Sequence, residues 1–239
     1  MDSSHTEAEA IPTYESLARL IDHLLLGVDL SEDQVFEGCR LAREYGVASV
    51  VVRPSDVDQV ARAMEGSPVR VASTVGYPHG SSVTGTKLYE GRDLLRRGVH
   101  EIDFVINAGK LMSRQFQYVE TELLQMAKSC QESGALLKVY VPTGILPDDL
   151  KIISAKICKR VDAQFIAIDP NEKDVAFVLP LLRERVELKI ASGVSSLDQA
   201  LEFRRTGCSR LATDDPAPIL DEWKAHLQRL QQAVQPVIS

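Results

Sequence analysis

The chain has 239 residues, is 44% hydrophobic and 26% charged, and carries a formal charge of −7. This composition is typical of a globular protein and excludes collagen, a coiled coil and bulk disorder. No block of five like charges occurs, so the chain lacks the basic face that a nucleic acid or an anionic membrane requires. We expect a small-molecule substrate, no nucleic acid and no membrane, while a homo-oligomer stays open.

The N-terminal residues are small, polar and acidic, which is unlike a signal peptide. We expect residues 1–13 to be a flexible segment and residues 14–235 to form one domain, because no linker or composition break interrupts them. The four cysteines are far apart and form no metal-binding motif. These features indicate a reducing cytoplasm, and we expect neither a metal nor another cofactor.

Eight short apolar runs rich in β-branched residues follow one another along the chain, separated by amphipathic stretches. The runs span residues 20–24, 48–53, 70–77, 101–107, 136–142, 163–169, 187–192 and 210–214. Helix caps bracket the intervening stretches, as at Ser31 with Gly46 and Ser196 with Gly207. The alternation predicts a single-domain (β/α)8 TIM barrel. An open doubly wound sheet is the alternative, but the first run lacks the glycine fingerprint of that fold.

Several of these apolar runs contain charged residues, which need either partners or a chemical role. The charged residues are Asp22, His23, Asp103, Lys138, Asp169, Lys189, Asp214 and Asp215. One interpretation is a structural ion-pair network, such as Asp103 with Lys189. The other is an active site, because barrel enzymes assemble their sites from the C-terminal ends of several strands.

The two-residue period of a strand indicates which side chains face the barrel interior. It places Asp103 and Asn107 on one face of the fourth run, and Lys138 and Tyr140 on one face of the fifth. The expected mouth of the barrel contains Asp22, Asp103, Asn107, Lys138, Tyr140, Asp169, Lys189 and Asp214. We take Asp103, Lys138, Asp169 and Lys189 as candidate catalytic residues and Asp22, Asn107 and Asp214 as candidate substrate-binding residues.

Five segments occur in an order that resembles the deoxyribose-phosphate aldolase family. They read IDHLLL, ASVVVRP, VGYPHG, TGTKLYEGRDLLRRGVHEIDFVINAGKL and LLKVYVPTGIL, and the similarity covers about residues 17–213. The resemblance implies a (β/α)8 barrel that makes and breaks a carbon–carbon bond. The family's Schiff base forms on a strand-six lysine, assisted by a strand-four aspartate and a strand-seven lysine.

Two of these three family positions are matched. Asp103 corresponds to the proton-relay aspartate and Lys189 to the second lysine. At the nucleophile the chain reads Phe165-Ile166-Ala167-Ile168-Asp169-Pro170, which puts Ala167 where the family has its Schiff-base lysine. Alanine has no amine, so no Schiff base can form at that position.

The segments that correspond to the family's phosphate site also depart from its pattern. Ser192 and Gly193 stand for the glycine pair that ends strand seven, whereas Asp214, Asp215 and Pro216 replace a turn rich in serine and glycine. Two carboxylates repel a phosphate, and proline has no N–H to donate. In the strand-five motif Pro142 replaces a glutamate that is often found there, while Thr143 and Gly144 remain. The resemblance adds Thr143, Ser192 and Gly193 to the candidate substrate-binding residues.

Three functions remain open. The first is a lyase whose amine has moved to Lys138 or Lys189. The second is an acid/base enzyme that uses Asp103, Asp169 and Lys189 on an uncharged or cationic substrate, with a metal variant at Asp22, His23, Asp169 and Asp214. The third is a binding protein without catalytic activity.

Overall fold

In the computed structural model, which describes residues 13–182 and 186–234, eight parallel strands close into a barrel. Each strand pairs with the next, and β8 pairs with β1. The strands are β1 (Ile21–Leu25), β2 (Ser49–Val52), β3 (Arg70–Val75), β4 (Glu101–Val105), β5 (Leu136–Tyr140), β6 (Phe165–Ile168), β7 (Glu187–Ile190) and β8 (Arg210–Thr213). The predicted barrel is therefore confirmed, and the strand bounds differ from the predicted runs by no more than two residues.

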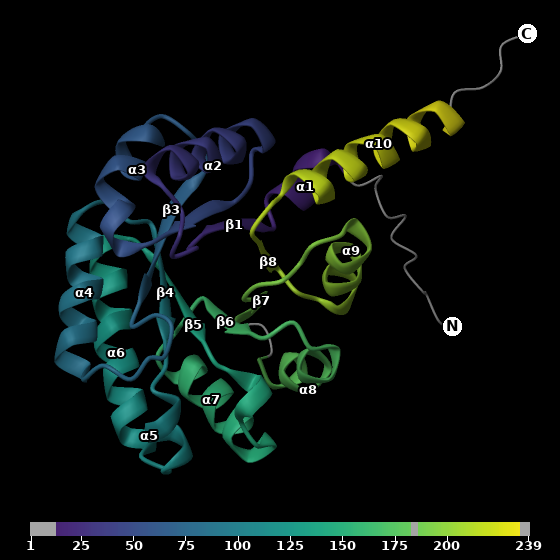
Figure 1. Ribbon diagram of the computed structural model, residues 1–239. Coiled ribbons are helices and arrows are strands. Elements are labelled where there is room, and N and C mark those ends of the chain that lie inside the picture. Colours follow the sequence, from purple (N-terminus) through teal and green to yellow (C-terminus); the bar gives the residue numbers. More distant parts are fainter. Residues whose placement is uncertain (1–12, 183–185, 235–239) are drawn as a thin grey trace, which may run out of the picture.

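Helices surround the strands in chain order (Figure 1). They are α1 (Tyr14–Ala18), α2 (Glu32–Tyr45), α3 (Val57–Ala63), α4 (Thr84–Arg96), α5 (Ala108–Met112), α6 (Phe116–Ser133), α7 (Asp148–Arg160), α8 (Glu172–Leu182), α9 (Leu197–Thr206) and α10 (Ala217–Val234), with short 3-10 turns η1 (Pro54–Asp56) and η2 (Thr143–Ile145). The predicted caps are confirmed, since Ser31 forms a capping box at α2 and Gly46 ends that helix in the left-handed conformation.

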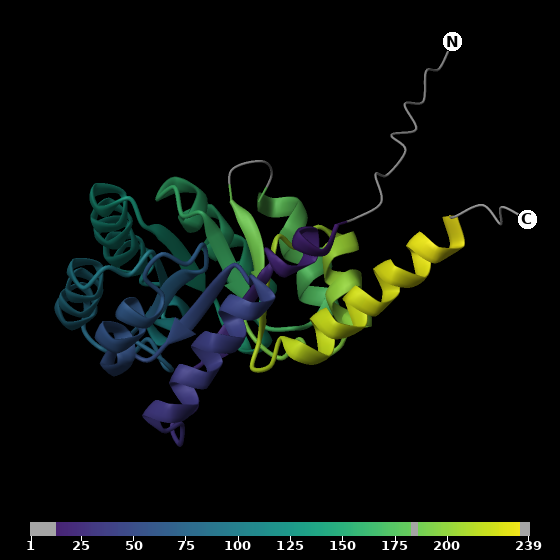
Figure 2. The ribbon, with the colours of Figure 1, turned by 90° about the horizontal axis from the view of Figure 1, so that it is seen from above.

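The C-terminal helix α10 extends beyond the rest of the molecule in both ribbon views (Figures 1 and 2). Its first turns are anchored by the buried side chains of Ile219, Leu220 and Trp223. The indole Nε1 of Trp223 donates a hydrogen bond to the carbonyl of Thr13, at 3.3 Å. The predicted flexible segment, residues 1–13, lies outside the described residues except for Thr13.

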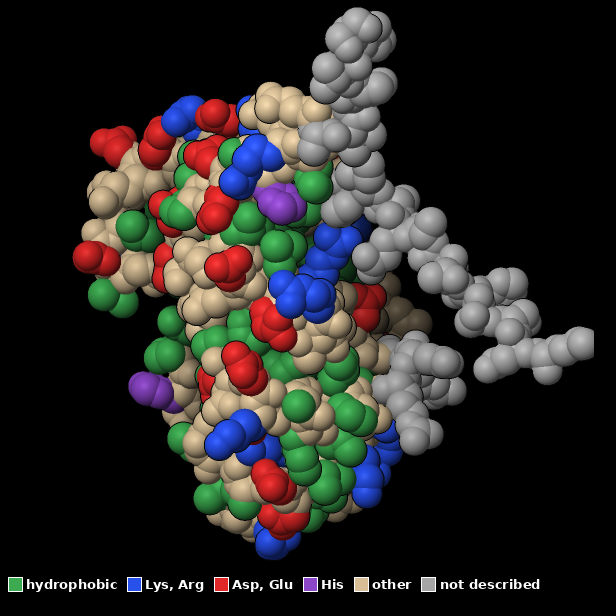
Figure 3. Space-filling model, turned by 90° about the vertical axis from the view of Figure 1, so that its right-hand side faces the viewer, with side chains coloured by type: hydrophobic (Ala, Val, Ile, Leu, Met, Phe, Trp, Pro, Cys, Tyr) green, Lys and Arg blue, Asp and Glu red, His purple; other side chains and the backbone are tan. Residues whose placement is uncertain are grey.

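Within residues 13–182 and 186–234, no helix combines the length and hydropathy needed to cross a membrane. On the face that lies to the right in Figure 1, acidic and basic side chains are interspersed with hydrophobic ones. The described residues on that face form no continuous basic stripe (Figure 3).

The loop between β3 and α4 is held against the barrel by Gly80 and a buried ion pair. Gly80 has a φ of +65°, and a Cβ at this position would collide with the backbone carbonyl of Ile106. Lys87 Nζ lies 2.9 Å from Glu122 Oε1, with both side chains fully buried, and 3.4 Å from the carbonyl of Gly80. Close backbone packing therefore fixes the loop that leads from β3 to α4.

Substituting Gly80→Ala is expected to destabilise the fold, because the added methyl combines an unfavourable φ with a backbone clash. We expect a loss of more than about 2 kcal/mol in the free energy of unfolding, measured by urea denaturation. Gly46→Ala is the matched control, since Gly46 has nearly the same φ of +63° but open space around its Cβ position. That control is expected to lose only about 1 kcal/mol. Equal losses for the two variants would contradict the proposed role of the Gly80 contact.

Candidate functional site

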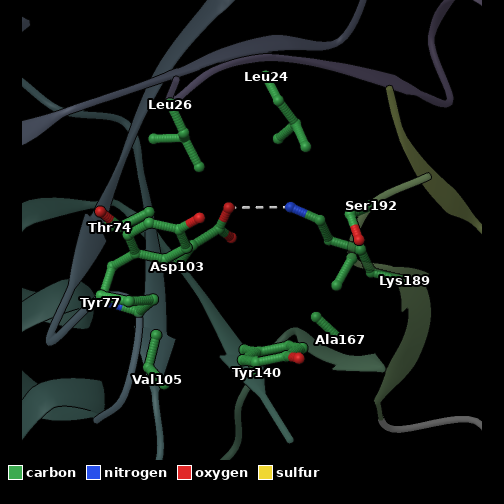
Figure 4. Close-up of a pocket in the computed structure, with 12 residues that line it drawn as sticks. Leu24, Leu26, Thr74, Tyr77, Asp103, Val105, Tyr140, Ala167, Lys189 and Ser192 are labelled. Atoms are coloured by element: carbon green, nitrogen blue, oxygen red, sulfur yellow. Dashed lines mark hydrogen bonds and ion pairs between the residues drawn. The ribbon is translucent and has the colours of Figure 1, made fainter. Parts of the chain in front are cut away.

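A pocket of about 240 Å3 opens at the C-terminal ends of the strands (Figure 4). Its lining is mainly apolar or hydroxyl-bearing, and Asp103 and Lys189 are the charged residues within it. The lining residues are Leu24, Leu26, Thr74, Tyr77, Pro78, Asp103, Val105, Tyr140, Ala167, Lys189, Ala191 and Ser192. The pocket therefore lies where barrel proteins carry their chemistry.

Asp103 and Lys189 form an ion pair across the barrel at this pocket. Lys189 Nζ lies 2.9 Å from Asp103 Oδ2, as the dashed line in Figure 4 marks. The Lys189 side chain is 2% exposed and that of Asp103 is 13% exposed, so water screens this pair only weakly. Lys189 also lies 2.8 Å from Asp22 Oδ2. The pocket thus contains an ammonium and a carboxylate in direct contact.

This pair is the part of a larger network of buried charges that lies nearest the pocket. Lys138 Nζ lies 3.1 Å from Asp22, 2.8 Å from Glu101 and 3.2 Å from Asp103. Arg210 contacts Asp22 at 2.7 Å and Glu101 at 3.3 Å. The cations Lys138, Lys189 and Arg210 are therefore balanced by the carboxylates Asp22, Glu101 and Asp103. This balance is what allows so many charges to be buried in one barrel.

The network fixes the protonation states of two of its deepest members. Burial opposes ionisation of the Asp22 carboxyl, but Lys138, Lys189 and Arg210 hold its pKa well below the ordinary value. Burial also opposes the charge on Lys138, yet the nearby carboxylates of Asp103, Asp22 and Glu101 raise its pKa. Lys138 is therefore an ammonium at neutral pH and is unsuited to nucleophilic attack.

The expectation that Asp22 and Lys138 line the mouth requires correction. Both side chains point into the barrel as the two-residue period predicts, but both are fully buried and neither lines the pocket. Asp22 bonds instead to Ser49 Oγ and to the cations described above. The period of a strand determines the face of a side chain, whereas its height in a tilted barrel depends on the stagger between strands.

The other predicted residues differ in their relation to the pocket. Ser192 lines the pocket, and Asp169 contacts the lining residue Tyr140, whose hydroxyl donates to Asp169 Oδ1 at 2.6 Å. The pocket lining does not include Asn107, Thr143, Gly193 or Asp214. Asn107 is the N-cap of α5, and its side-chain oxygen accepts the backbone N–H of Lys110.

The suggested metal ligands do not come together. Asp22 lies in the buried network, whereas Asp169 accepts hydrogen bonds from Tyr140 and from the backbone N–H of Gly144. His23 Nε2 lies 3.1 Å from the backbone carbonyl of Asp214 rather than from its carboxylate. In the part of the chain that the structure describes, no three His, Cys, Asp or Glu side chains form a group suited to a metal ion.

Sequence reasoning missed two members of the network, Glu101 and Arg210. Glu101 is fully buried at the start of β4, two residues before Asp103 and on the same face. Arg210 begins β8. The two-residue period contained the signal for Glu101, because it shares the parity of Asp103. Both residues lie at the start of a strand, where charged side chains are usually solvated. Sequence reasoning therefore did not place them in a buried network.

The fold and the pocket define an α/β-barrel protein with an amine and a carboxylate paired at the C-terminal ends of its strands. Comparison with proteins of similar sequence leads to the same class. A deoxyribose-phosphate aldolase of Clostridium kluyveri is 31% identical over 215 residues, which cover 87% of this chain and 98% of the relative. The corresponding protein of Trichormus variabilis is 34% identical, over 82% of this chain and 88% of the relative. This chain belongs to the deoxyribose-phosphate aldolase family.

The barrel also superposes on solved structures. The deoxyribose phosphate aldolase of Aeropyrum pernix matches with a TM-score of 0.82 at 23% identity, over 90% of this chain and 93% of that one, which shows the fold alone. No family model matches the chain.

We expect Asp103 and Lys189 to be energetically coupled. Because removing one partner leaves the other charge buried, Asp103→Asn and Lys189→Met should each lower the free energy of unfolding by about 3 kcal/mol or more. The double variant should lose less than the sum of the two, with a coupling of about 1 to 3 kcal/mol in urea denaturation. The exposed pair Glu37 and Arg40 is the control and should show coupling near zero. A zero coupling at Asp103 and Lys189 would rule out the pairing.

The buried His23 is expected to make the fold sensitive to mild acid. Burial lowers the pKa of His23 below 6.5. The unfolded chain therefore binds a proton more readily than the folded one, and the stability present above pH 6.5 is lost as the pH falls through the folded-state pKa. The loss is at most about 1.4 kcal/mol per pH unit. His23→Gln keeps a donor for the carbonyl of Asp214 and should flatten the curve of unfolding free energy between about pH 7 and pH 5. An unchanged slope would show that His23 does not titrate in this way.

Proposed function

We propose that this chain is a carbon–carbon lyase that acts on a small, unphosphorylated hydroxycarbonyl compound at the pair formed by Asp103 and Lys189. The observation that carries the proposal is their 2.9 Å contact at the base of an otherwise neutral pocket. The remaining lining is apolar or hydroxyl-bearing, which suits an uncharged molecule. Membership of an aldolase family favours a reaction of this class.

The proposed reaction uses the two charges for different tasks. Asp103 takes the proton of the substrate hydroxyl, and the bond between the carbinol carbon and the α-carbon breaks to release an aldehyde. The electron pair of that bond forms an enolate, whose oxygen is stabilised by the ammonium of Lys189. Asp103 then returns its proton to the α-carbon. No proton or electron is left over, and the step needs no external reactant.

The environment of Ala167 supports a mechanism without a lysine on β6. Ala167 lies beside Lys189 in the register of β6 and β7, and it lines the pocket. By the family resemblance, this is the position of the Schiff-base lysine. A methyl group cannot act as a nucleophile, so in this proposal Asp103 and Lys189 carry out the reaction instead.

The loops after β7 and β8 support the absence of a substrate phosphate. The backbone N–H of Ala217, at the start of α10, is bound by the carboxylate of Asp215 at 2.9 Å. The N–H of Ser195 is bound by Gln199 Oε1 at 3.0 Å. Two backbone donors near these helix starts are therefore occupied by the chain's own side chains, which leaves fewer of them for a phosphate. Asp214, which is exposed, adds further negative charge to the turn after β8.

A second candidate is a Schiff base on Lys189, favoured because Lys189 is the lysine that lines this pocket. Its ammonium would first pass a proton to Asp103, and the free amine would add to the substrate carbonyl. Loss of water with return of that proton would give a protonated imine, which would accept the electron pair of the breaking bond and become an enamine. The burial of Lys138 among three carboxylates argues against this role for it. Borohydride reduction with acetaldehyde distinguishes the candidates, because only the imine mechanism adds an ethyl group to Lys189.

Activity is best tested as acetaldehyde release from deoxyribose and from its 5-phosphate, followed with a coupled dehydrogenase. We expect release from the free sugar and none from the phosphorylated one. Asp103→Asn and Lys189→Met should each reduce kcat by about 100-fold or more, since each removes a reacting group. Lys224→Met, at an exposed site on α10, is the matched control and should retain activity. Preferred cleavage of the phosphorylated sugar, or full activity of Asp103→Asn, would disprove the proposal.

A further inference from the structure

The Tyr140 side chain crosses from β5 to β6 beside Ala167. Tyr140 and Ala167 are direct partners in the register of these two strands, and both line the pocket. The Tyr140 hydroxyl reaches Asp169, two residues beyond Ala167 along the chain, at 2.6 Å. Asp169 directly follows the last residue of β6, and the strand register sets Tyr140 beside Ala167, so the ring lies along Ala167 on its way to Asp169. Figure 4 shows Tyr140 and Ala167 together, on the side of the pocket away from Leu24 and Leu26.

Asp169 holds the far end of this ring in place. Its Oδ2 accepts the backbone N–H of Gly144 at 2.9 Å, while its Oδ1 accepts the Tyr140 hydroxyl. A Cβ on Gly144 would lie 3.2 Å from Asp169 Oδ2, so the turn after β5 approaches this carboxylate closely. Tyr140 is therefore held by its strand at one end and, at the other, by a carboxylate that the backbone N–H of Gly144 anchors.

The phenol of Tyr140 is neutral and has spare acceptor capacity. Burial and the hydrogen bond to the Asp169 carboxylate raise the pKa of Tyr140 above its ordinary value. A phenol has one proton to donate and also accepts hydrogen bonds. Because that one proton is used in the hydrogen bond to Asp169, the Tyr140 oxygen can act toward the pocket only as a hydrogen-bond acceptor.

We propose that Tyr140 is a specificity-determining residue of this pocket. Its ring occupies the space over Ala167, which limits the length of the substrate, and its oxygen accepts a hydrogen bond from a substrate hydroxyl. This inference rests on the proposed function for the location of the site, and it deepens that function by naming the second polar contact. The substrate is a short compound with its carbonyl near Lys189 and its reacting hydroxyl at Asp103, and a further hydroxyl lies near Tyr140.

Binding of two ligands that differ by one hydroxyl tests the acceptor role without requiring turnover. Acetoin and butanone are titrated into the full chain, and affinities are measured by NMR. The wild-type chain should bind acetoin about 3- to 10-fold more tightly, the range expected for one hydrogen bond. Tyr140→Phe keeps the ring but removes the oxygen, and it should abolish this preference. Tyr89→Phe is the matched control at an exposed tyrosine of α4 and should retain it.

The possible results separate this inference from the proposed function. A preference for acetoin that Tyr140→Phe abolishes supports the role of Tyr140, even if no lyase activity is found. Equal affinities in the wild-type chain, or a preference that survives in Tyr140→Phe, overturn it, even if the lyase activity is present. Thermal unfolding of each variant confirms that the comparison is made on folded protein.

A second experiment tests whether the Tyr140 ring occupies the space over Ala167. Ala167→Lys should react poorly with acetaldehyde and borohydride, because the Tyr140 ring fills the space that the lysine needs. The double variant Ala167→Lys with Tyr140→Val should be labelled at residue 167 at least about 10-fold more than the single variant, since the valine opens that space. If Ala167→Lys unfolds and the double variant folds, the conclusion is the same. Full labelling of the single variant would show that Tyr140 does not occupy the space.

Discussion

The barrel interior is organised by one constraint, the neutralisation of buried charge. Lys138 contacts three carboxylates, and Asp22 contacts three cations, so each of these groups is held by partners from several strands. An isolated charge at this depth would cost several kcal/mol, whereas a balanced set can be buried. The network thereby joins β1, β4, β5, β7 and β8 through their side chains, in addition to the backbone ladder of the barrel.

The two charged residues of the pocket are also members of this network. Asp103 and Lys189 belong both to the buried set and to the pocket lining, so their positions are fixed from beneath before any substrate arrives. Such preorganisation is what electrostatic catalysis requires, because no reorientation is needed during the reaction. On the β5–β6 side, Tyr140 and Asp169 form a second rigid contact that is independent of the first.

The sequence was sufficient to predict the strand order, the closed barrel, the helix caps and the inward direction of Asp103 and Lys189. These features depend on local periodicity and capping, which nearby residues encode. The same periodicity did not predict that Asp22 and Lys138 lie below the pocket, because height within a barrel depends on the stagger of strands far apart in the chain. The roles of Glu101 and Arg210 depend on partners from other strands, including each other, which lie 109 residues apart along the chain.

Lys189 and Asp103 belong both to the buried network and to the pocket lining, and this has an evolutionary consequence. A chain that lost every catalytic requirement would still be selected to keep both residues, because removing either leaves unbalanced charge in the core and lowers the amount of folded protein. Ala167 is under no such constraint, since its methyl group carries no charge and has no charged partner in the core. In a barrel built this way, the presence of the charged residues is therefore explained by the demands of folding and is not by itself evidence of catalysis.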